Sequence, residues 1–297
     1  MRASVSVREG ALSRWGTFGP ALLLMLALGL LPLANLVYTS FHTVTWSGGQ
    51  ATFEPAGFKH YLALPHDPLL RAGLRNTIVF AIGAVGGQMI LGFALALLCS
   101  RVSRGRVLYR AVLILPILIP GIVIGAIWKL MLNYDFGLLN QITDLFGIEP
   151  RNWLGDQSTA LASVIAVDIW HWTPFCFLLL LAGLESLPQD PYEAAKIDGA
   201  TWWQELRYIT LPLMAPAIAV TFAFRLVIAF KVFDEIYLMT GGGPVTATEV
   251  LSFTLFQRLF TEDRAGYGSA MAIAIIFLCS LLLVIALSVR RRSESAG

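Results

Sequence analysis

Charge and cysteine are both scarce in this chain. Only 13% of its 297 residues are Asp, Glu, Lys or Arg, whereas soluble domains carry about 25%. Hydrophobic residues reach 57%, and the mean hydropathy is +0.70. A composition with so little charge excludes an ordinary soluble domain and indicates a protein that lies in a membrane.

The cysteines follow no spacing that is typical of a metal site or a disulfide framework. Cys99, Cys176 and Cys279 each lie inside or at the edge of an apolar run, which predicts small hydrophobic side chains that are buried. The net charge of +2 is small, and membrane topology explains the basic clusters, so we expect no nucleic-acid partner.

Catalytic motifs are lacking as well. The sequence contains no GxxxxGKS/T phosphate loop, no HExxH motif and no Ser-His-Asp arrangement. We therefore expect no catalytic residues, no cofactor and no metal in this chain. Any ATP hydrolysis that the protein uses must belong to a partner.

Six apolar runs are long enough to cross a bilayer, whose core of about 30 Å needs roughly 20 residues of helix. The runs are solidly apolar rather than alternating, which favours helices over the strands of a barrel. The first run is too long for a signal peptide, so we expect it to be retained. The sequence predicts an all-α, polytopic membrane bundle with spans near 18–40, 76–99, 109–132, 159–184, 213–237 and 268–289.

The orientation follows from Lys and Arg in the connections, which gather on the cytoplasmic side. Twelve of them lie at the two ends of the chain and in the second and fourth connections, against six on the opposite side. Both termini are therefore predicted to be cytoplasmic. The chain divides into a cytoplasmic segment 1–17, a first helix with its external loop 18–72, a core 73–290 and a cytoplasmic tail 291–297.

Three connecting stretches have their own local signals. Residues 41–72 and 133–158 carry turn residues and enough aromatic side chains to fold locally, so they either meet an external partner or simply connect helices. The stretch "TGGGP" at 240–244 lacks the lysine of a phosphate loop and predicts a flexible turn.

The third run contains "LILPILIPG", with Pro116, Pro120 and Gly121 in its interior. Proline removes a backbone donor and clashes with the preceding turn, so this helix should kink or break. A membrane tolerates the freed backbone groups only where protein or a water-filled cavity covers them, which places the run inside the bundle.

A polar segment at 185–216 separates the fourth and fifth runs. Asp190 before Pro191 is typical of a helix N-cap, and Gly199 should end the short helix that follows. A second helix is expected from near Thr201, and two prolines then lead into the next span. Both helices are expected on the cytoplasmic face, where they either dock on another protein or lie on lipid headgroups, a role that would favour more Lys and Arg.

This segment carries a specific pattern, made of Glu193, Ala194, Ala195, Asp198, Gly199, Ala200, Ile209, Leu211, Pro212 and Pro216. The pattern closely resembles the EAA loop of permease subunits in bacterial binding-protein-dependent ABC importers. From about residue 75 to the C-terminus the chain also resembles the carbohydrate branch of that family, the maltose-type permeases. Leu206 departs from the pattern, since many relatives carry an aromatic residue there, although leucine can still fill an apolar pocket.

The resemblance implies an ABC importer type I permease fold in the bacterial cytoplasmic membrane. In such importers the loop forms a coupling helix that docks on an ATP-binding subunit, and that subunit binds ATP and Mg²⁺. The implied partners are two ATP-binding cassette subunits, a second permease, an external solute-binding protein and membrane lipid. The implied coupling residues are Glu193, Ala194, Ala195, Asp198, Gly199, Ala200, Leu206, Leu211 and Pro212.

Ionisable residues inside spans are costly and indicate either a solute route or a buried pair. Asp168, His171, Trp172 and Phe175 share one helical face of the fourth run, while Trp170 points nearly the other way. An aromatic face beside a few polar groups suits a sugar.

Arg225 lies at a similar depth in the fifth run, so we expect it to face the same interior region as Asp168. The two residues either form a structural ion pair or line the solute route. His171 is either pH-sensitive or an ordinary hydrogen-bonded interior histidine. Lys231 and Glu235, four residues apart, predict a structural salt bridge.

The function predicted first is the permease subunit of an ATP-driven sugar importer. Within the same machinery, the solute is alternatively glycerol phosphate, a polyamine or another small molecule. Outside the family, the alternative is a stand-alone channel or ion-coupled carrier, which needs no cytoplasmic docking helix and usually shows internal repeats. A membrane-embedded enzyme lacks any catalytic constellation in this sequence.

Overall fold

The computed structural model describes residues 7–101 and 105–294, and the chain folds as two compact units. One unit comprises the described residues up to Leu64 together with Phe256–Ile275, and the other comprises Pro65–Leu255 and the described residues from Ile276 onward. The outer ends of the two predicted cytoplasmic segments, 1–6 and 295–297, lie outside the described residues. The predicted division at residues 72 and 73 stays a prediction.

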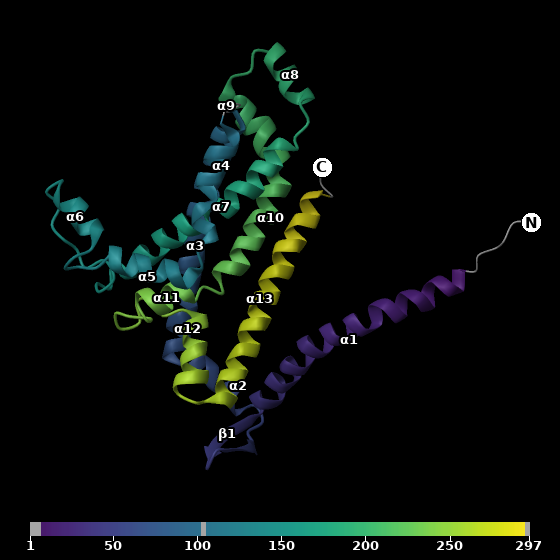
Figure 1. The fold of residues 1–297 in the computed structure, drawn as a ribbon, viewed down its shortest axis with the longest axis vertical. Helices are drawn as coiled ribbons and strands as arrows, with labels where there is room; N and C mark the ends of the chain where they lie inside the picture. Colours follow the sequence, from purple (N-terminus) through teal and green to yellow (C-terminus); the bar gives the residue numbers. More distant parts are fainter. Residues whose placement is uncertain (1–6, 102–104, 295–297) are drawn as a thin grey trace, which may run out of the picture. The chain divides into compact units, whose positions relative to one another are not determined.

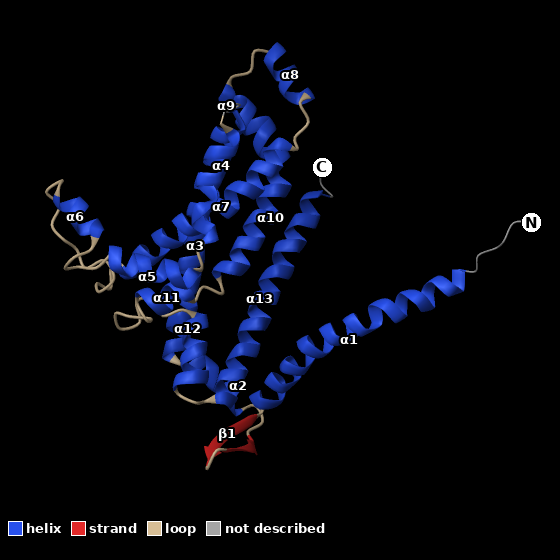
Figure 2. Cartoon of the chain, viewed as in Figure 1, coloured by secondary structure: helices blue, strands red, loops and turns tan. Residues whose placement is uncertain are grey.

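The unit that includes the N-terminal helix contains a hairpin. Helix α1 (Val7–Ser40) leads into strands β1 (His42–Ser47) and β2 (Gln50–Pro55), which pair antiparallel and are drawn in red in Figure 2. Gly48 and Gly49 make the turn at φ +59° and +81°, which only glycine adopts easily. The alternating residues around Gly-Gly signal this hairpin, and the all-helical reading of the sequence missed it.

The remaining part of this unit contacts the hairpin at His42, the first residue of β1. It contains α2 (Lys59–Ala63), the π-helical turn η4 (Gln257–Thr261) and the beginning of α13 (Ala265–Glu294). His60 Nε2 donates to the carbonyl oxygen of His42 at 3.2 Å. An added Cβ at Gly266 would lie 2.0 Å from that same oxygen, so the start of α13 packs directly on β1.

The other unit is a bundle of helices. Its elements, labelled in Figure 1, are α3 (Pro68–Arg101), α4 (Arg106–Ile114), η2 (Leu115–Leu118), α5 (Gly121–Met131), α6 (Leu138–Asp144), α7 (Ala160–Glu185), α8 (Asp190–Ile197), α9 (Trp202–Gln204), η3 (Glu205–Thr210), α10 (Leu211–Ala229), α11 (Asp234–Met239) and α12 (Leu251–Phe256). The short 3₁₀ turn η1 (Leu64–His66) precedes them.

Helices α3, α7 and α10 form the core of the bundle and lie side by side in Figure 1. Their fully buried side chains include Phe177, Leu180 and Met214. Two glycines let α3 approach α7 closely: an added Cβ would lie 2.5 Å from Ile169 at Gly87 and 2.8 Å from Cys176 at Gly92. The three cysteines are free. Cys99 and Cys176 are buried as predicted, whereas Cys279 is only half-buried, which differs from the prediction.

Within the described parts of the chain, four helices are long and apolar enough to cross a membrane. They are Phe18–Ser40, Pro68–Ser100, Ala160–Glu185 and Trp202–Ala229, and they match four of the six predicted runs. The third run forms a pair of helices, Val107–Leu118 and Gly121–Met131, bent by 91°, which would make a fifth span and confirms the predicted break at the prolines. The sixth run lies in α13, whose apolar part in the described structure is the shorter Ala265–Leu281.

The fifth run differs from the prediction in two places. Helix α10 ends at Ala229 instead of 237, and α11 is a separate short helix, because Glu235 turns toward α7. The predicted salt bridge between Lys231 and Glu235 is therefore wrong, since Lys231 lies in the break and helical spacing does not apply across it. At its other end the span continues through the π-helical turn η3 into α9, so no separate second helix forms on the membrane surface.

Candidate functional site

The interior face of α7 is arranged as its sequence predicts. Asp168 and His171 are buried, at 2% and 3% exposure, and Trp172 and Phe175 are half-buried on the same face. Trp170 is 42% exposed and points away from them, with its ring 5.5 Å from that of Trp128. The helix thus presents two ionisable groups and two aromatic rings to the interior of the bundle.

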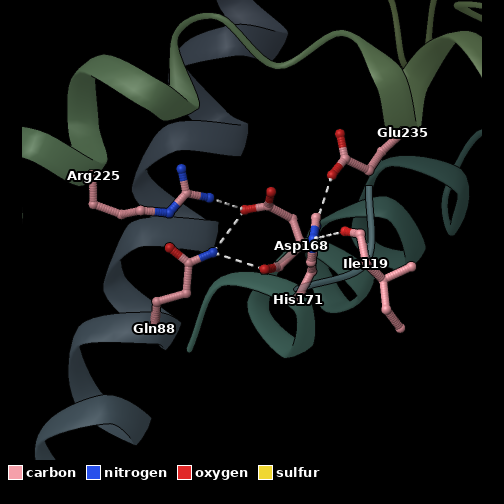
Figure 3. Close-up of polar contacts among 6 residues, drawn as sticks. All are labelled: Gln88, Ile119, Asp168, His171, Arg225 and Glu235. Carbon is pink, nitrogen blue, oxygen red and sulfur yellow. Dashed lines mark hydrogen bonds and ion pairs between the residues drawn. The ribbon is translucent and has the colours of Figure 1, made fainter. Parts of the chain in front are cut away.

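Asp168 and Arg225 meet across α7 and α10, as expected. Arg225 Nη2 donates to Asp168 Oδ2 at 2.5 Å, and the two side chains are 1% and 3% exposed. Gln88, on α3, donates from Nε2 to the same carboxylate oxygen at 2.7 Å and to the backbone oxygen of Asp168 at 2.9 Å (Figure 3). The charge cluster therefore ties three helices together in the bundle core.

Sequence reasoning missed Gln88. The available signal was a polar side chain in the middle of an apolar run, which needs a hydrogen-bonding partner as much as an ionisable one does. Gln88 is completely buried, and it reaches Asp168 because Gly87 lets α3 and α7 approach closely.

Arg225 has hydrogen-bonding capacity to spare. Its guanidinium carbon lies 4.6 Å from the centre of the Trp172 ring, whose face therefore stabilises the cation. Arg225 Nε and Nη1 and Gln88 Oε1 are buried without a hydrogen-bond partner among the described residues. Two donors and one acceptor beside an aromatic ring can bind hydroxyl groups, which accept and donate at once.

His171 bridges two further segments. Its Nε2 lies 3.1 Å from the carbonyl oxygen of Ile119, at the bend of the third run, and its Nδ1 lies 3.2 Å from Oε1 of Glu235 (Figure 3). Glu235 is 5% exposed and sits in the first turn of α11. Sequence analysis placed Glu235 on the fifth span with a lysine partner and missed this contact.

The two polar clusters border one small cavity. Its volume is about 170 Å³, and its lining includes the charged or titratable residues Asp168, His171, Arg225, Lys231, Asp234 and Glu235, together with Trp172. Phe175 packs edge-on against Trp172, with ring centres 6.0 Å apart, just beside this lining. A cavity with polar groups of both charge signs and an aromatic wall suits a polar solute.

The polar segment between α7 and α10 forms the short helix that the sequence predicts. Helix α8 begins at Asp190, so its N-cap is Gln189, one residue earlier than predicted. Gly199 adopts φ +73°, and the Ala200 N–H donates to the carbonyl oxygen of Ala195 at 2.9 Å, which ends the helix in the way expected of glycine. Thr201 caps the next helix, and its N–H donates to Gln204 Oε1 at 2.7 Å.

The residues of the resemblance fall into two groups by burial. Glu193, Ala194, Asp198, Gly199, Leu211 and Pro212 are exposed. Ala195 and Leu206 are buried against their own chain at 8% and 9% exposure, and Ala200 is half-buried. The apolar pocket that Leu206 fills therefore belongs to this chain, beside a cavity of about 820 Å³ that separates α8 from the ends of α3, α4 and α7.

Residues 88–294 match the model of one protein family, described as the inner membrane component of binding-protein-dependent transport systems. The chain belongs to this family of transport-system inner membrane components. Membership makes the protein a multi-pass membrane permease and a transport subunit rather than an enzyme.

Relatives of this permease family extend the match to almost the whole chain. The trehalose/maltose transport system permease protein MalF of Thermococcus litoralis is 36% identical over 92% of this chain and 91% of its own length. The sulfoquinovosyl glycerol transport system permease protein SmoG of Agrobacterium fabrum is 32% identical over 99% of both chains.

A solved structure supports the permease fold. A crystal structure of a bacterial alginate ABC transporter, in complex with an alginate pentasaccharide-bound periplasmic protein, contains a chain that superposes on this one with a TM-score of 0.83. The alignment covers 96% of each chain at 22% identity, so it shows that the two share a fold. The fold is that of the type I ABC importer permeases.

Proposed function

We propose that this permease carries a sugar into the cytoplasm as one subunit of an ATP-driven importer. The observation that carries the proposal is the exposed short helix α8, which Gly199 ends, a docking element that a channel or carrier acting alone does not need. Relatives named for trehalose and maltose, for sulfoquinovosyl glycerol and for starch degradation products support a carbohydrate as the solute.

Helix α8 has the surface of a coupling helix. Glu193 and Asp198 are exposed and can pair with basic residues of an ATP-binding subunit. Ile197 is 86% exposed at the end of this otherwise polar helix. A large apolar side chain that is exposed in this way can fill a pocket on a partner. Gly199 fixes the direction in which the chain leaves α8, so movement of the docked helix is passed to α9 and α10.

The solute route is proposed to pass the small cavity beside Asp168 and Arg225. Unpartnered donors and an acceptor, together with Trp172, are the groups that would bind the hydroxyls and the C–H face of a sugar. The ion pair itself has two roles open to it, a structural one that holds α7 to α10 and a direct one in the route.

The charge-swapped variant Asp168→Arg with Arg225→Asp distinguishes these roles. Assembly and transport that recover together favour the structural role, while assembly without transport favours contact with the solute. Gln88 helps this test, because its free Oε1 can accept from an arginine at position 168.

The complete importer is proposed to contain this permease, a second permease, two ATP-binding cassette subunits and an external solute-binding protein, in the bacterial cytoplasmic membrane with both termini inside. Asp168, His171, Trp172, Phe175 and Arg225 are its proposed route residues. The coupling residues are proposed as the resemblance implies, with the exposed members touching the ATP-binding subunit and the buried ones holding the shape of the segment.

Purification and transport assays test this function. Tagged protein should bring down an ATP-binding subunit and a second permease, and the assembly in vesicles should take up a sugar from a panel presented with its binding protein. Ile197→Ser should weaken ATPase docking, whereas Ile148→Ser, which removes a 47% exposed isoleucine elsewhere in the bundle unit, should not. Uptake of only glycerol phosphate or a polyamine would support the alternative solute, and a protein that purifies alone and transports would contradict the proposal.

A further inference from the structure

We infer that His171 and Glu235 form a binding site for a single proton, and that this proton joins α11 to α7 at the bend of the third run. The inference follows from the hydrogen-bonding capacity of the two ring nitrogens. It concerns a contact within this chain and does not depend on which solute is carried.

The carbonyl oxygen of Ile119 decides the state of the ring. A carbonyl oxygen only accepts hydrogen bonds, so Nε2 of His171, 3.1 Å away, must carry a hydrogen. In a neutral imidazole only one nitrogen carries hydrogen, and Nδ1 is then left with a lone pair. This lone pair faces Glu235 Oε1 at 3.2 Å.

The second contact therefore needs one more proton. If Glu235 is a carboxylate, both atoms would present lone pairs, and the contact would be repulsive. A proton on Nδ1 gives an imidazolium that donates to the carboxylate, and a proton on Glu235 gives a carboxylic acid that donates to neutral imidazole. In both arrangements the pair holds one proton and carries no net charge.

The surroundings favour the protonated pair. The His171 and Glu235 side chains are only 4% and 7% exposed. Of the other charged groups that line the cavity, Asp168 and Arg225 compensate each other, and Lys231 and Asp234 are exposed. The neighbouring side chain of α3, Gln88, is neutral, and the bend contributes Ile119 and Gly121, which carry no charged side chain. Loss of the proton would leave one uncompensated negative charge in an interior that penalises it.

The proton connects three segments: the bend of the third run, α7 and α11. Ile119 is extended at φ −87° and ψ 127°, just before Pro120, so no helical N–H satisfies its carbonyl oxygen and His171 does so instead. On the other side, Glu235 lies in the first turn of α11, which packs so closely on α5 that an added Cβ at Gly125 would lie 2.9 Å from Leu238. When the proton leaves, His171 keeps its bond to the bend, while α11 loses its polar tie to α7.

The direction of the pH dependence follows from this arrangement. The contact is closed in acid and opens as the pH rises and the proton leaves. Since one proton is released, opening should increase by up to about tenfold per pH unit above the transition.

Hydrogen–deuterium exchange of the assembled transporter in nanodiscs measures this opening. After correction for the intrinsic effect of pH on exchange, peptides that cover 234–239 should exchange faster near about pH 8 than near about pH 6. Glu235→Gln should abolish this difference, because its amide can donate permanently to a neutral Nδ1 and has no proton to lose. Asp234→Asn is the matched control, since it removes a neighbouring carboxylate of the same cavity and should keep the pH response.

Two results would overturn the inference. One is equal corrected exchange of 234–239 in the wild type at both pH values, and the other is a full pH response in Glu235→Gln. If Glu235→Gln does not assemble, His171→Gln replaces it, because an amide cannot become a cation, and it too should lose the response. A response that persists in that variant would contradict the site equally.

Discussion

The buried ion pair between Asp168 and Arg225 allows a quantitative prediction. With both side chains almost fully buried and 2.5 Å between Nη2 and Oδ2, replacing one partner leaves a charge that no other residue balances. Asp168→Asn keeps the shape of the side chain but leaves the guanidinium of Arg225 uncompensated. Breaking a buried pair in this way costs about 3–5 kcal/mol in the free energy of unfolding, or roughly two to nearly four powers of ten in the ratio of folded to unfolded protein.

The other two members of the cycle are expected to behave differently. Arg225→Met leaves a buried carboxylate that can bind a proton and become neutral, so its loss of stability should be smaller than that of Asp168→Asn. The double variant Asp168→Asn with Arg225→Met contains no buried charge at this place. Apolar or neutral replacements of a whole buried pair are often nearly neutral, so the double variant should be more stable than Asp168→Asn alone.

Equilibrium unfolding of the purified protein in mixed micelles measures the three free energies. Arg264→Met is the control. Arg264 is half exposed, and its Nη1 lies 3.6 Å from Oε2 of Glu262. An exposed ion pair of this kind contributes at most about 1 kcal/mol to the free energy of unfolding. The reasoning is refuted if Asp168→Asn costs no more than this control, or if the losses of the two single variants add up in the double variant.

Three further predictions concern individual contacts. Gly199→Ala should destabilise the end of α8 by about 1 kcal/mol, because φ +73° strains a residue with a Cβ. The amount of solute taken up per ATP hydrolysed should fall as well. Gly199→Asn should be affected less, because asparagine adopts this conformation more easily. Gly92→Ala should lower the unfolding free energy by about 1–3 kcal/mol, since its Cβ would lie 2.8 Å from Cys176, whereas Gly86→Ala on the same helix meets nothing within 4 Å and should leave it unchanged. Asn140→Ala should make residues 133–158 sensitive to limited proteolysis, because it removes two hydrogen bonds. Asn140 Oδ1 accepts from Trp153 Nε1 at 2.7 Å, and Nδ2 donates to the Arg151 carbonyl oxygen at 3.0 Å. Asn140→Asp keeps the first of these bonds, so it should be cleaved more slowly than Asn140→Ala.

Local signals in the sequence were sufficient where a residue acts through its own backbone. Gly199 ends α8, because glycine adopts positive φ angles that other residues avoid. The prolines bend the third run, because proline removes a backbone donor and fixes its own φ angle. Both effects are independent of the surrounding residues. The facing of Asp168 and Arg225 was also predictable, since depth in the membrane follows from the helical rise alone.

Tertiary contacts decided what the sequence left hidden. No proline or glycine follows Ala229 before Gly241 to indicate that α10 must stop, and the partner of Glu235, His171, lies 64 residues earlier. The roles of Gln88 and Asn140 were missed for a related reason. A neutral amide gives no charge signal, and its importance depends on partners that only the folded chain brings within reach.

The π-helical turn η3 lies between the capped helix α9 and the span α10, and it affects the direction in which the side chains of α10 point. A π turn closes its hydrogen bonds five residues apart instead of four, so it stores a surplus residue in the same helical cylinder. Each residue of an α-helix advances the direction of its side chain by roughly 100°. A one-residue deletion within 205–210 would therefore remove this surplus and leave the guanidinium of Arg225 facing Asp168, whereas a one-residue deletion in the regular helix between Leu211 and Arg225 would rotate it away.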